Sequence, residues 1–348
     1  MDLGLFKTFI EADAPRVQCP RHGGGTQAVP WARRGSAFVR AFEDQAAWLA
    51  TRIDKTSLSS LLRIAWRTVG AIVERVCNEA RKHIDPLHGV ERIGIDEVSY
   101  RKGHKYLTVV LDHDTGRLLW ARAGRDEATL RAFFDELGPA RCARIRLVSA
   151  DAASWIAAVV KERCPHATLC LDPFHIVKWG QEALDEVRRE LWNQLRRDGK
   201  KEQADSLKHS RWALAKNPED LTDKQRIKLS DVERDNAPLF RAYVLKEQLR
   251  SVFQYSGASV GVQLTGFLAM AENSRLPSFV KLAQRIRTHR DGILAAARHG
   301  LSNARLESAN RKIRLLCHLA YGFHSPAPLI ALALLKLGGL CPPLPLLR

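Results

Sequence analysis

The chain has 348 residues, of which 45% are hydrophobic and 27% are charged. This length supports two or three modules with packed cores, and the composition excludes both an intrinsically disordered chain and a membrane-embedded one. The 55 Lys and Arg residues against 38 Asp and Glu residues give a formal net charge of +17, which indicates a polyanionic partner, with DNA or RNA first. The alternative is a basic protein whose composition reflects Arg-rich codon usage.

The sequence carries no signal for export or for a membrane anchor. Its seven Cys residues are scattered without the paired spacing of a secreted disulfide framework. The start, residues 1–6, lacks a basic segment followed by an apolar core, and the apolar run Leu329–Leu340 is too short to span a bilayer. We therefore expect a cytoplasmic protein without a membrane partner.

Residues 1–35 are predicted to be loop-like, because they contain the glycine run Gly23–Gly25. Cys19 and His22 form the Cys-x-x-His half of a zinc site. A structural zinc ion needs four ligands, and no upstream Cys-x-x-Cys pair supplies the other two. We therefore do not expect bound zinc, and Cys19 and His22 are candidates only for residual ligands.

Residues 36–88 are predicted to be helical and to contain a helix-turn-helix, with two short helices that meet near Arg63. The second helix begins with Trp66, Arg67 and Thr68, at the end where such a helix contacts base edges or phosphates. An ordinary helical hairpin is the alternative explanation. The apolar residues predicted to face the core share the helical spacing: Leu58, Leu61 and Leu62 in the first helix, and Val69, Ile72, Val73 and Val76 in the second.

Residues 89–179 show the pattern of an α/β domain. Three strands, a helix, a strand, a helix and a strand follow one another, which is the order of an RNase H-like mixed sheet flanked by helices. The predicted elements, in chain order, are Arg92–Val98, Tyr106–Leu111, Arg117–Ala121, a helix through Leu130 and Leu137 that ends at Gly138, Arg144–Ser149, Ser154–Arg163 and Ala167–Leu171.

The pattern changes after Trp179. Residues 180–300 form charged amphipathic helices with short breaks, which predicts an all-helical insertion into the α/β domain. Residues 301–348 return to that domain with an amphipathic helix over Leu301–Cys317 and close with a Pro-rich tail.

Two acids follow apolar strands of the predicted sheet. Asp96 ends the run Ile93–Ile95, and Asp151 follows the fourth strand, which we expect beside the first. A carboxylate at the centre of a sheet is costly unless it is paired or binds a cation, so both residues are candidate metal ligands. Either residue alone is explained more simply as a turn former or a helix cap, and it is the occurrence of two such acids on neighbouring strands that favours a metal site.

A third acid is expected from a helix packed on the same sheet, and Glu307 is the candidate. Helical spacing places Asn303, Glu307, Arg311 and Arg314 on one polar face, where arginines suit phosphate groups. The alternative is an ordinary solvated helix face. The opposite face is apolar and contains Leu306, Ile313 and Leu316.

Three carboxylates can hold two Mg²⁺ ions about 4 Å apart for in-line displacement at phosphorus, with Mn²⁺ as a substitute. No covalent nucleophile is needed in such a site. Asp172 and His175 follow the fifth strand and are candidates to support it, with His175 touching the scissile phosphate or orienting a carboxylate. A histidine that is simply satisfied in the core is the alternative.

Five ordered motifs resemble the ISL3 family of bacterial insertion-sequence transposases, and the likeness covers nearly the whole chain. The motifs are Ile93–His104, Val148–Asp151, Leu171–His175, Asn303–Glu307 and Ala320–Phe323. The resemblance implies a DDE triad that maps onto Asp96, Asp151 and Glu307, and separations of 55 and 156 residues fit a catalytic domain interrupted by an insertion. Family members begin with a fuller Cys-rich zinc segment, so we expect an N-terminal segment that is shortened or misassigned.

The resemblance implies an enzyme that cleaves double-stranded DNA at the terminal inverted repeats of its element and joins the ends to target DNA. It also implies a homo-oligomer on DNA, a nucleoid-associated location and no small-molecule substrate. Two alternatives remain: a catalytically silent DNA-binding protein derived from a transposase, and a nuclease that hydrolyses DNA without joining it.

Overall fold

The computed structural model describes residues 8–9, 11–21, 23–301 and 304–344. The chain divides into two compact units. Unit 1 combines Met1–Arg144 with Arg305–Arg348, and unit 2 is Ile145–Ala304. Each unit has its own apolar core, so each is treated below by itself.

A mixed five-stranded sheet confirms the predicted α/β fold class. Strands β3, β4 and β5 are antiparallel neighbours in unit 1, whereas β6 and β7 are parallel neighbours in unit 2. The strand order is β5-β4-β3-β6-β7. The strand bounds are Arg92–Arg101 for β3, Lys105–Asp112 for β4, Leu118–Ala123 for β5, Leu147–Ala150 for β6 and Thr168–Leu171 for β7.

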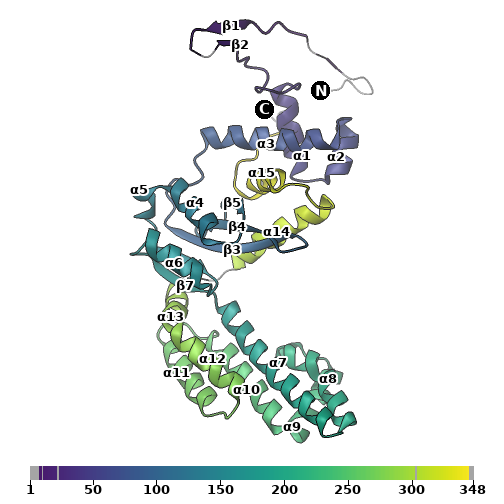
Figure 1. Cartoon of the computed structure of the whole chain (residues 1–348), viewed down its shortest axis with the longest axis vertical. Coiled ribbons are helices and arrows are strands. Elements are labelled where there is room, and N and C mark those ends of the chain that lie inside the picture. Colours follow the sequence, from purple (N-terminus) through teal and green to yellow (C-terminus); the bar gives the residue numbers. More distant parts are fainter. Residues whose placement is uncertain (1–7, 10, 22, 302–303, 345–348) are drawn as a thin grey trace. The chain divides into compact units, whose positions relative to one another are not determined.

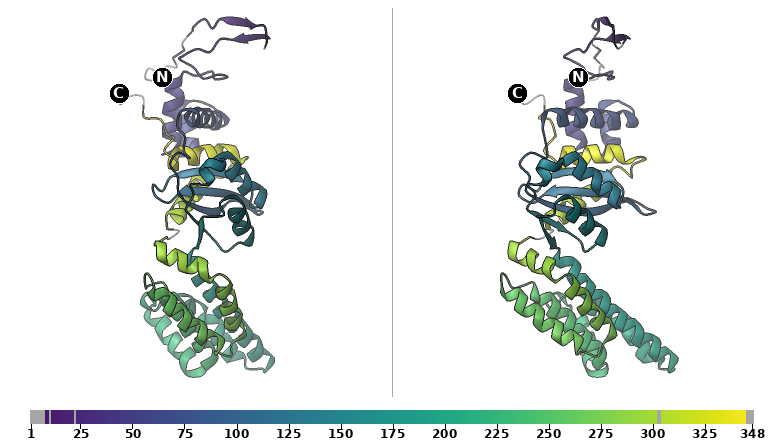
Figure 2. Two further views of the ribbon diagram at one scale, coloured as in Figure 1. Left: turned by 90° about the vertical axis from the view of Figure 1, so that its left-hand side faces the viewer. Right: turned by 60° about the vertical axis from the view of Figure 1, so that its left-hand side comes forward.

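Three N-terminal helices and two C-terminal helices share one core with the β3–β5 face (Figure 1). Helix α15 packs on both α3 and β5. The views in Figure 2 agree that α3 and α15 lie side by side. The helices of unit 1 are α1 (Arg40–Ala50), α2 (Lys55–Leu62), α3 (Trp66–His83), α4 (Glu127–Leu137), α5 (Pro139–Cys142), α14 (Ala304–Leu319) and α15 (Pro326–Leu337).

The predicted apolar faces of these helices are mostly buried, although Leu62 of α2 is only half-buried. Val69, Ile72, Val73 and Val76 of α3 are all core residues, as is Leu58 of α2. Leu61 is 61% exposed, so its assignment to the buried face of α2 was wrong. Helix α2 has only eight residues and ends at Leu62. Arg63 follows it in the left-handed conformation (φ 53°), so the chain turns away before a second apolar row forms.

The N-terminal region contains a short hairpin where a loop was predicted. Strands β1 (Arg16–Cys19) and β2 (Gly23–Thr26) pair in antiparallel register, and the glycine run lies in β2. Backbone hydrogen bonds alone hold such a ribbon, so its sequence lacks the apolar alternation on which strand prediction depends. Cys19 ends β1, and the second residual zinc candidate, His22, lies outside the described residues.

Unit 2 is mostly helical after its two strands. The long helix α7 starts at Pro173 directly after Asp172, and it packs against α8, α10 and α12 (Figure 1). The helices are α6 (Ser154–Arg163), α7 (Pro173–Arg197), α8 (Lys201–Ala215), the 3₁₀ turn η1 (Pro218–Asp220), α9 (Asp223–Asp235), α10 (Ala237–Val252), α11 (Ser259–Glu272), α12 (Pro277–Thr288) and α13 (Arg290–His299).

All seven cysteines lie within the described residues, and none of them is in a disulfide bond. Within the described part of the chain, no helix combines the length and the apolar character that crossing a membrane requires.

Candidate catalytic and nucleic-acid site

Asp96 lies on β3 and is bonded directly to α14. One carboxylate oxygen, Oδ1, accepts the backbone N–H of Glu97 at 2.7 Å, and the other, Oδ2, accepts Nδ2 of Asn310 at 2.7 Å. Asn310 is only 3% exposed. A hydrogen bond that carries a charged acceptor is about twice as strong as a neutral one. This part-buried bond therefore fixes α14 against β3 at the candidate catalytic carboxylate.

Gly94 allows α14 to approach β3 this closely. A Cβ atom at Gly94 would lie 2.5 Å from Cδ1 of Leu306 and 3.0 Å from Nε2 of His113. Gly94 and Asp96 share one face of the strand, and Leu306 and Asn310 are one helical turn apart. The pairs Gly94 with Leu306 and Asp96 with Asn310 therefore show that α14 runs in the same direction as β3.

Glu307 lies on α14 three residues before Asn310, and its side chain is largely exposed. Its carboxylate is 3.7 Å from the guanidinium of Arg311, one turn further along the helix. Arg305 ties the start of α14 to the turn after β4, because its Nη1 donates to the backbone carbonyls of His113 and of Asp114, the latter at 2.8 Å. The helix thus presents Glu307 to solvent from a firmly anchored first turn.

Asp96 and Asn310 bring together the two kinds of oxygen ligand that suit a hard divalent cation. Oδ1 of Asn310 is buried and has no hydrogen-bond partner, although it sits on the same amide that binds Asp96. Carboxylate and amide oxygens are the ligands that Mg²⁺ accepts in proteins. Among the described residues, no group of three His, Cys, Asp or Glu side chains is close enough to form a complete ligand set.

Asp151 follows β6 in unit 2, as the sequence predicts. Its Oδ1 accepts the backbone N–H of Ala153 at 3.1 Å. This bond is the one expected if Asp151 is only a turn former. The side chain also lines a pocket with His289 and Asp291. Burial, followed by the charge of Arg285, lowers the pKa of His289. Asp151 is therefore partly engaged in a turn and still faces an open pocket.

Asp172 and His175 form the start of α7. Asp172 is buried and caps the helix, because its Oδ1 accepts the backbone N–H of Phe174 at 3.2 Å. Nε2 of His175 lies 3.9 Å from Oδ2 of Asp172, which is an ion-pair distance and longer than a hydrogen bond. Asp172 thus has a structural role in addition to the predicted supporting one.

The predicted DNA-contacting residues at the start of α3 differ in exposure. Arg67 is exposed, whereas Trp66 and Thr68 are half-buried. The Trp66 ring is covered by Nζ of Lys55, which lies 3.3 Å from its centroid, and it makes an edge contact with His324. Of the three residues, Arg67 has the side chain most accessible to DNA.

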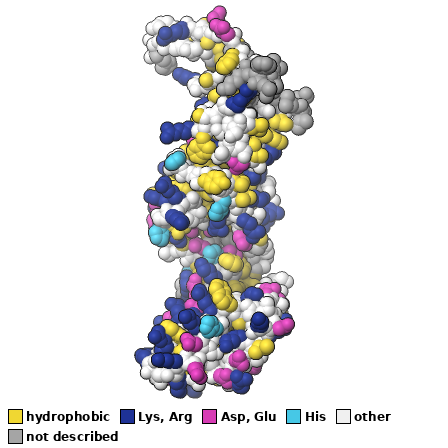
Figure 3. All heavy atoms as spheres, turned by 90° about the vertical axis from the view of Figure 1, so that its right-hand side faces the viewer, with side chains coloured by type: hydrophobic (Ala, Val, Ile, Leu, Met, Phe, Trp, Pro, Cys, Tyr) yellow, Lys and Arg dark blue, Asp and Glu magenta, His cyan; other side chains and the backbone are white. Residues whose placement is uncertain are grey.

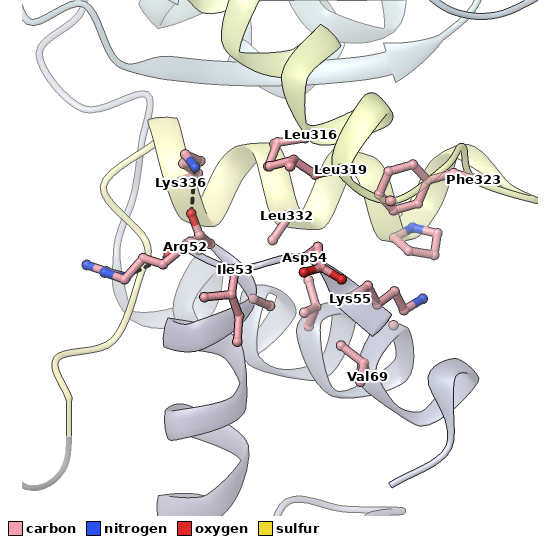
Figure 4. A pocket seen from close by; sticks show the side chains of 16 residues that line it. Arg52, Ile53, Asp54, Lys55, Val69, Leu316, Leu319, Phe323, Leu332 and Lys336 are labelled. Carbon is pink, nitrogen blue, oxygen red and sulfur yellow. Dashed lines mark hydrogen bonds between the residues drawn. The ribbon is translucent and has the colours of Figure 1, made fainter. Parts of the chain in front are cut away.

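The junction between α1 and α2 packs on the C-terminal helices around a mostly apolar pocket. Figure 4 shows Ile53 and Val69 on one side and Leu316, Phe323 and Leu332 on the other. A dashed line in the same view marks the bond from Nζ of Lys336 to the Thr51 carbonyl, 2.6 Å long. The helix-turn-helix and the helix that carries Glu307 therefore belong to one packed body.

Basic side chains are spread over the face drawn in Figure 3, with acidic side chains between them. Arg314, the predicted DNA contact on α14, is exposed. Asn303, which was predicted to support the active site, lies outside the described residues.

Sequence reasoning missed Asn310 and Gly94. Asn310 stands three residues after Glu307, and this spacing places it near the same helix face. The sequence did offer one indication of its role: Asn310 is a polar residue beside the apolar row Leu306, Ile313 and Leu316 of α14. Gly94 stands between the β-branched residues Ile93 and Ile95 of β3, and a glycine inside a strand indicates close approach of another segment.

Comparisons with known proteins agree with this architecture. Residues 93–333 match the family model for an ISL3 transposase of the DDE type, and residues 27–77 match the helix-turn-helix domain of transposase family ISL3. The transposase for insertion sequence element IS1557, found in two strains of Mycobacterium tuberculosis, is 51% identical over 364 aligned residues, which cover 99% of this chain and 82% of the relative. The transposase for IS1001 of Bordetella parapertussis is 29% identical over 327 residues, covering 92% of this chain and 80% of the relative.

Proposed function

The chain belongs to the ISL3 family of transposases, and from this premise we propose that it cleaves DNA at the ends of its insertion element and joins those ends to target DNA. The observation that carries the proposal is the bond between Asp96 and Asn310. It anchors the helix of Glu307 at a strand carboxylate, which is the support that a phosphoryl-transfer site needs to hold its acids in place.

We assign the three catalytic carboxylates to Asp96, Asp151 and Glu307. Asn310 would hold the Asp96 carboxylate in one orientation through its Nδ2, and its Oδ1 would add a neutral oxygen ligand. These residues would hold Mg²⁺, or Mn²⁺ in its place. When bound, the metal would activate the attacking hydroxyl and stabilise charge on the phosphoryl oxygens. Asp172, His175, Asn303 and Arg311 are proposed to support the site.

DNA binding is assigned to the helix-turn-helix and to basic residues of α14. Arg67 would contact the terminal repeat from the start of α3, with Trp66 and Thr68 beside it, and Arg314 would bind phosphate. Transposition brings two ends into one assembly, so we propose that the protein acts as a homo-oligomer on DNA, at the nucleoid. We also keep the five segments 1–35, 36–88, 89–179, 180–300 and 301–348 as the proposed functional division of the chain.

The test is a Mg²⁺-dependent cleavage and joining assay on DNA that carries the flanking element ends. Wild type is compared with Asp96→Asn, Asp151→Asn and Glu307→Gln. Asp205→Asn is the matched control, because Asp205 is an exposed acid on α8. The three site variants should bind DNA with wild-type affinity and lose cleavage by about 10³-fold or more, since each removes a charge that only the transition state needs.

Either of two results would refute this assignment. Full cleavage by Asp151→Asn would show that another acid supplies the third carboxylate. Binding without cleavage by the wild type, even with Mn²⁺, would favour the catalytically silent DNA-binding alternative. Cleaved but unjoined products would instead indicate a nuclease.

A further inference from the structure

Tyr321 occupies a backbone position that normally belongs to glycine. The N–H of Tyr321 donates to the His318 carbonyl at 3.0 Å, and the N–H of Gly322 donates to the Cys317 carbonyl at 2.9 Å. This pair of bonds is a Schellman motif, whose left-handed residue is usually Gly because a side chain is strained there. Tyr321 adopts it with φ 51°. The end of α14 therefore accepts strain in order to place a tyrosine.

The strained side chain does not pack in the core. Tyr321 is 92% exposed, the highest value for a large apolar side chain among the residues described. A residue held in a sparsely populated conformation without local packing points to a function for that side chain. Its aromatic ring is available to an external partner.

The ring stands at a basic hollow between the end of β3 and the end of α14. Cationic side chains line this hollow from both elements, and its described lining contains no Asp or Glu. The lining residues are Ser99, Tyr100, Arg101, Lys102, Arg314, Cys317, His318, Tyr321 and Gly322. Arg101, Lys102 and Arg314 are all exposed. Arginines and lysines beside an exposed aromatic ring are the combination that binds single-stranded nucleic acid, with cations on phosphates and the ring on a base.

The hollow lies further along β3 and α14 than Asp96, in the direction in which both elements run. Because α14 and β3 run in the same direction, both lead from Asp96 and Asn310 toward the hollow. Arg101 is five residues beyond Asp96 on β3, which corresponds to roughly 16 Å at the rise of a strand. A stacked DNA strand rises about 3.4 Å per nucleotide, so this distance spans about five nucleotides.

We infer that this hollow binds an unpaired or terminal nucleotide of the DNA strand near the cleavage position, with the Tyr321 ring stacked on its base. The bases of an intact duplex are stacked on one another, so an exposed ring can stack only on a base at an end or outside the helix. The cations of Arg101, Lys102 and Arg314 bind the flanking phosphates. This inference rests on the proposed function, since it names the form of DNA that the same site holds.

The experiment measures binding by the full chain without a divalent cation, so that it does not depend on cleavage. The probes are a blunt duplex oligonucleotide and the same duplex with a short unpaired extension that carries the fluorescent base analogue aminopurine. Tyr321→Ala, Tyr321→Gly and Tyr321→Phe are compared with Tyr255→Ala, which removes an exposed tyrosine from unit 2.

Wild type is expected to prefer the extended duplex and to quench aminopurine. Tyr321→Ala and Tyr321→Gly should lose about 5- to 150-fold of affinity for the extended duplex, the range for one base stacked on an aromatic side chain, and bind the blunt duplex unchanged. Tyr321→Phe and Tyr255→Ala should resemble wild type. Tyr321→Gly should also melt roughly 2–4 °C higher, because glycine relieves the strain.

Equal affinity of wild type for the two probes, or unchanged binding of the extension by Tyr321→Ala and Tyr321→Gly, overturns the inference. Loss of the preference in Tyr321→Phe also overturns it, because the hydroxyl would then be the contact. Failure of the proposed function would give a different result. Asp96→Asn and Asp151→Asn would then leave cleavage unchanged, while the preference of the protein for the extended duplex would stay as it is.

Discussion

Replacing Gly94 with alanine tests whether close packing of α14 on β3 positions the candidate catalytic residues. The added Cβ would lie 2.5 Å from Cδ1 of Leu306, and carbon atoms in contact are separated by about 3.5–4.0 Å. Leu306 is fully buried, so it cannot swing into solvent. The helix must therefore move outward by about 1.0–1.5 Å.

Such a movement affects stability and function to different degrees. Overpacking of a core typically lowers the free energy of unfolding by about 1–3 kcal/mol. The bond of 2.7 Å between Asn310 and Asp96 would lengthen past the distance at which a hydrogen bond forms. A misplacement of about 1 Å at a catalytic group reduces the rate by about 100-fold. Gly94→Ala should therefore retain its fold while losing most cleavage activity.

The assay combines urea unfolding with DNA cleavage, and it includes a double mutant. Leu306→Ala alone should cost about 2–5 kcal/mol, because it empties a fully buried site. In the double mutant both contacts with Leu306 are gone and only the 3.0 Å approach to Nε2 of His113 remains, so its stability should be close to that of Leu306→Ala alone. Gly266→Ala is the control, since a Cβ there meets no atom within 4 Å. Strict additivity of the two single changes, or normal cleavage by Gly94→Ala, would refute the reasoning.

Two further predictions concern the N-terminal helices. Glu43 is fully buried and accepts hydrogen bonds from Arg75 at 2.6 and 2.8 Å and from Arg33 at 3.3 Å. Glu43→Ala should therefore lower the free energy of unfolding, measured by urea titration, by about 3–5 kcal/mol. A loss below about 1 kcal/mol would contradict the role of the ion pairs. Burial lowers the pKa of Lys55 from 10.5 to about 8, so between these values the unfolded chain binds more protons and stability rises with pH, whereas below pH 8 Lys55 contributes no pH dependence. NMR titration of methylated lysines should show a midpoint near 8 for Lys55 that Trp66→Phe alters, and a midpoint near 10.5 for Lys55 would refute the burial argument.

Helices and strands that bury one face could be predicted from the sequence, because their apolar residues recur at the spacing of the element. The helix with Leu130 and Phe133 was predicted because it buries one face and is bounded by caps. The strand that carries Asp96 was predicted from its apolar run, but it extends to Arg101, beyond the predicted end at Val98, so Asp96 lies within β3 and does not end it. Helix α15 was not predicted, because its apolar residues surround it and leave no polar stripe at helical spacing.

Some residues of the candidate site could be picked out from the sequence and others could not, for a physical reason. Asp96 and Glu307 stand out in sequence because each is an acid at the end of an apolar run or row. Asn310 does not stand out, since its importance comes from a contact with Asp96 across 214 positions of the chain. Contacts of that range depend on the register between a helix and a strand, which local patterns do not specify.

The divided arrangement of unit 1 has a consequence for synthesis on the ribosome. The apolar face of α3 is covered by α15, which belongs to the last segment of the chain, and all of unit 2 is translated between them. At about 5–20 residues per second, that interval lasts roughly 8–30 s. During this time the helix-turn-helix carries a bare apolar surface that chaperones and proteases recognise. A message that stops within unit 2 should therefore yield a short-lived fragment that never accumulates on the element's ends, so a broken copy of the gene would not act as an inhibitor of intact ones.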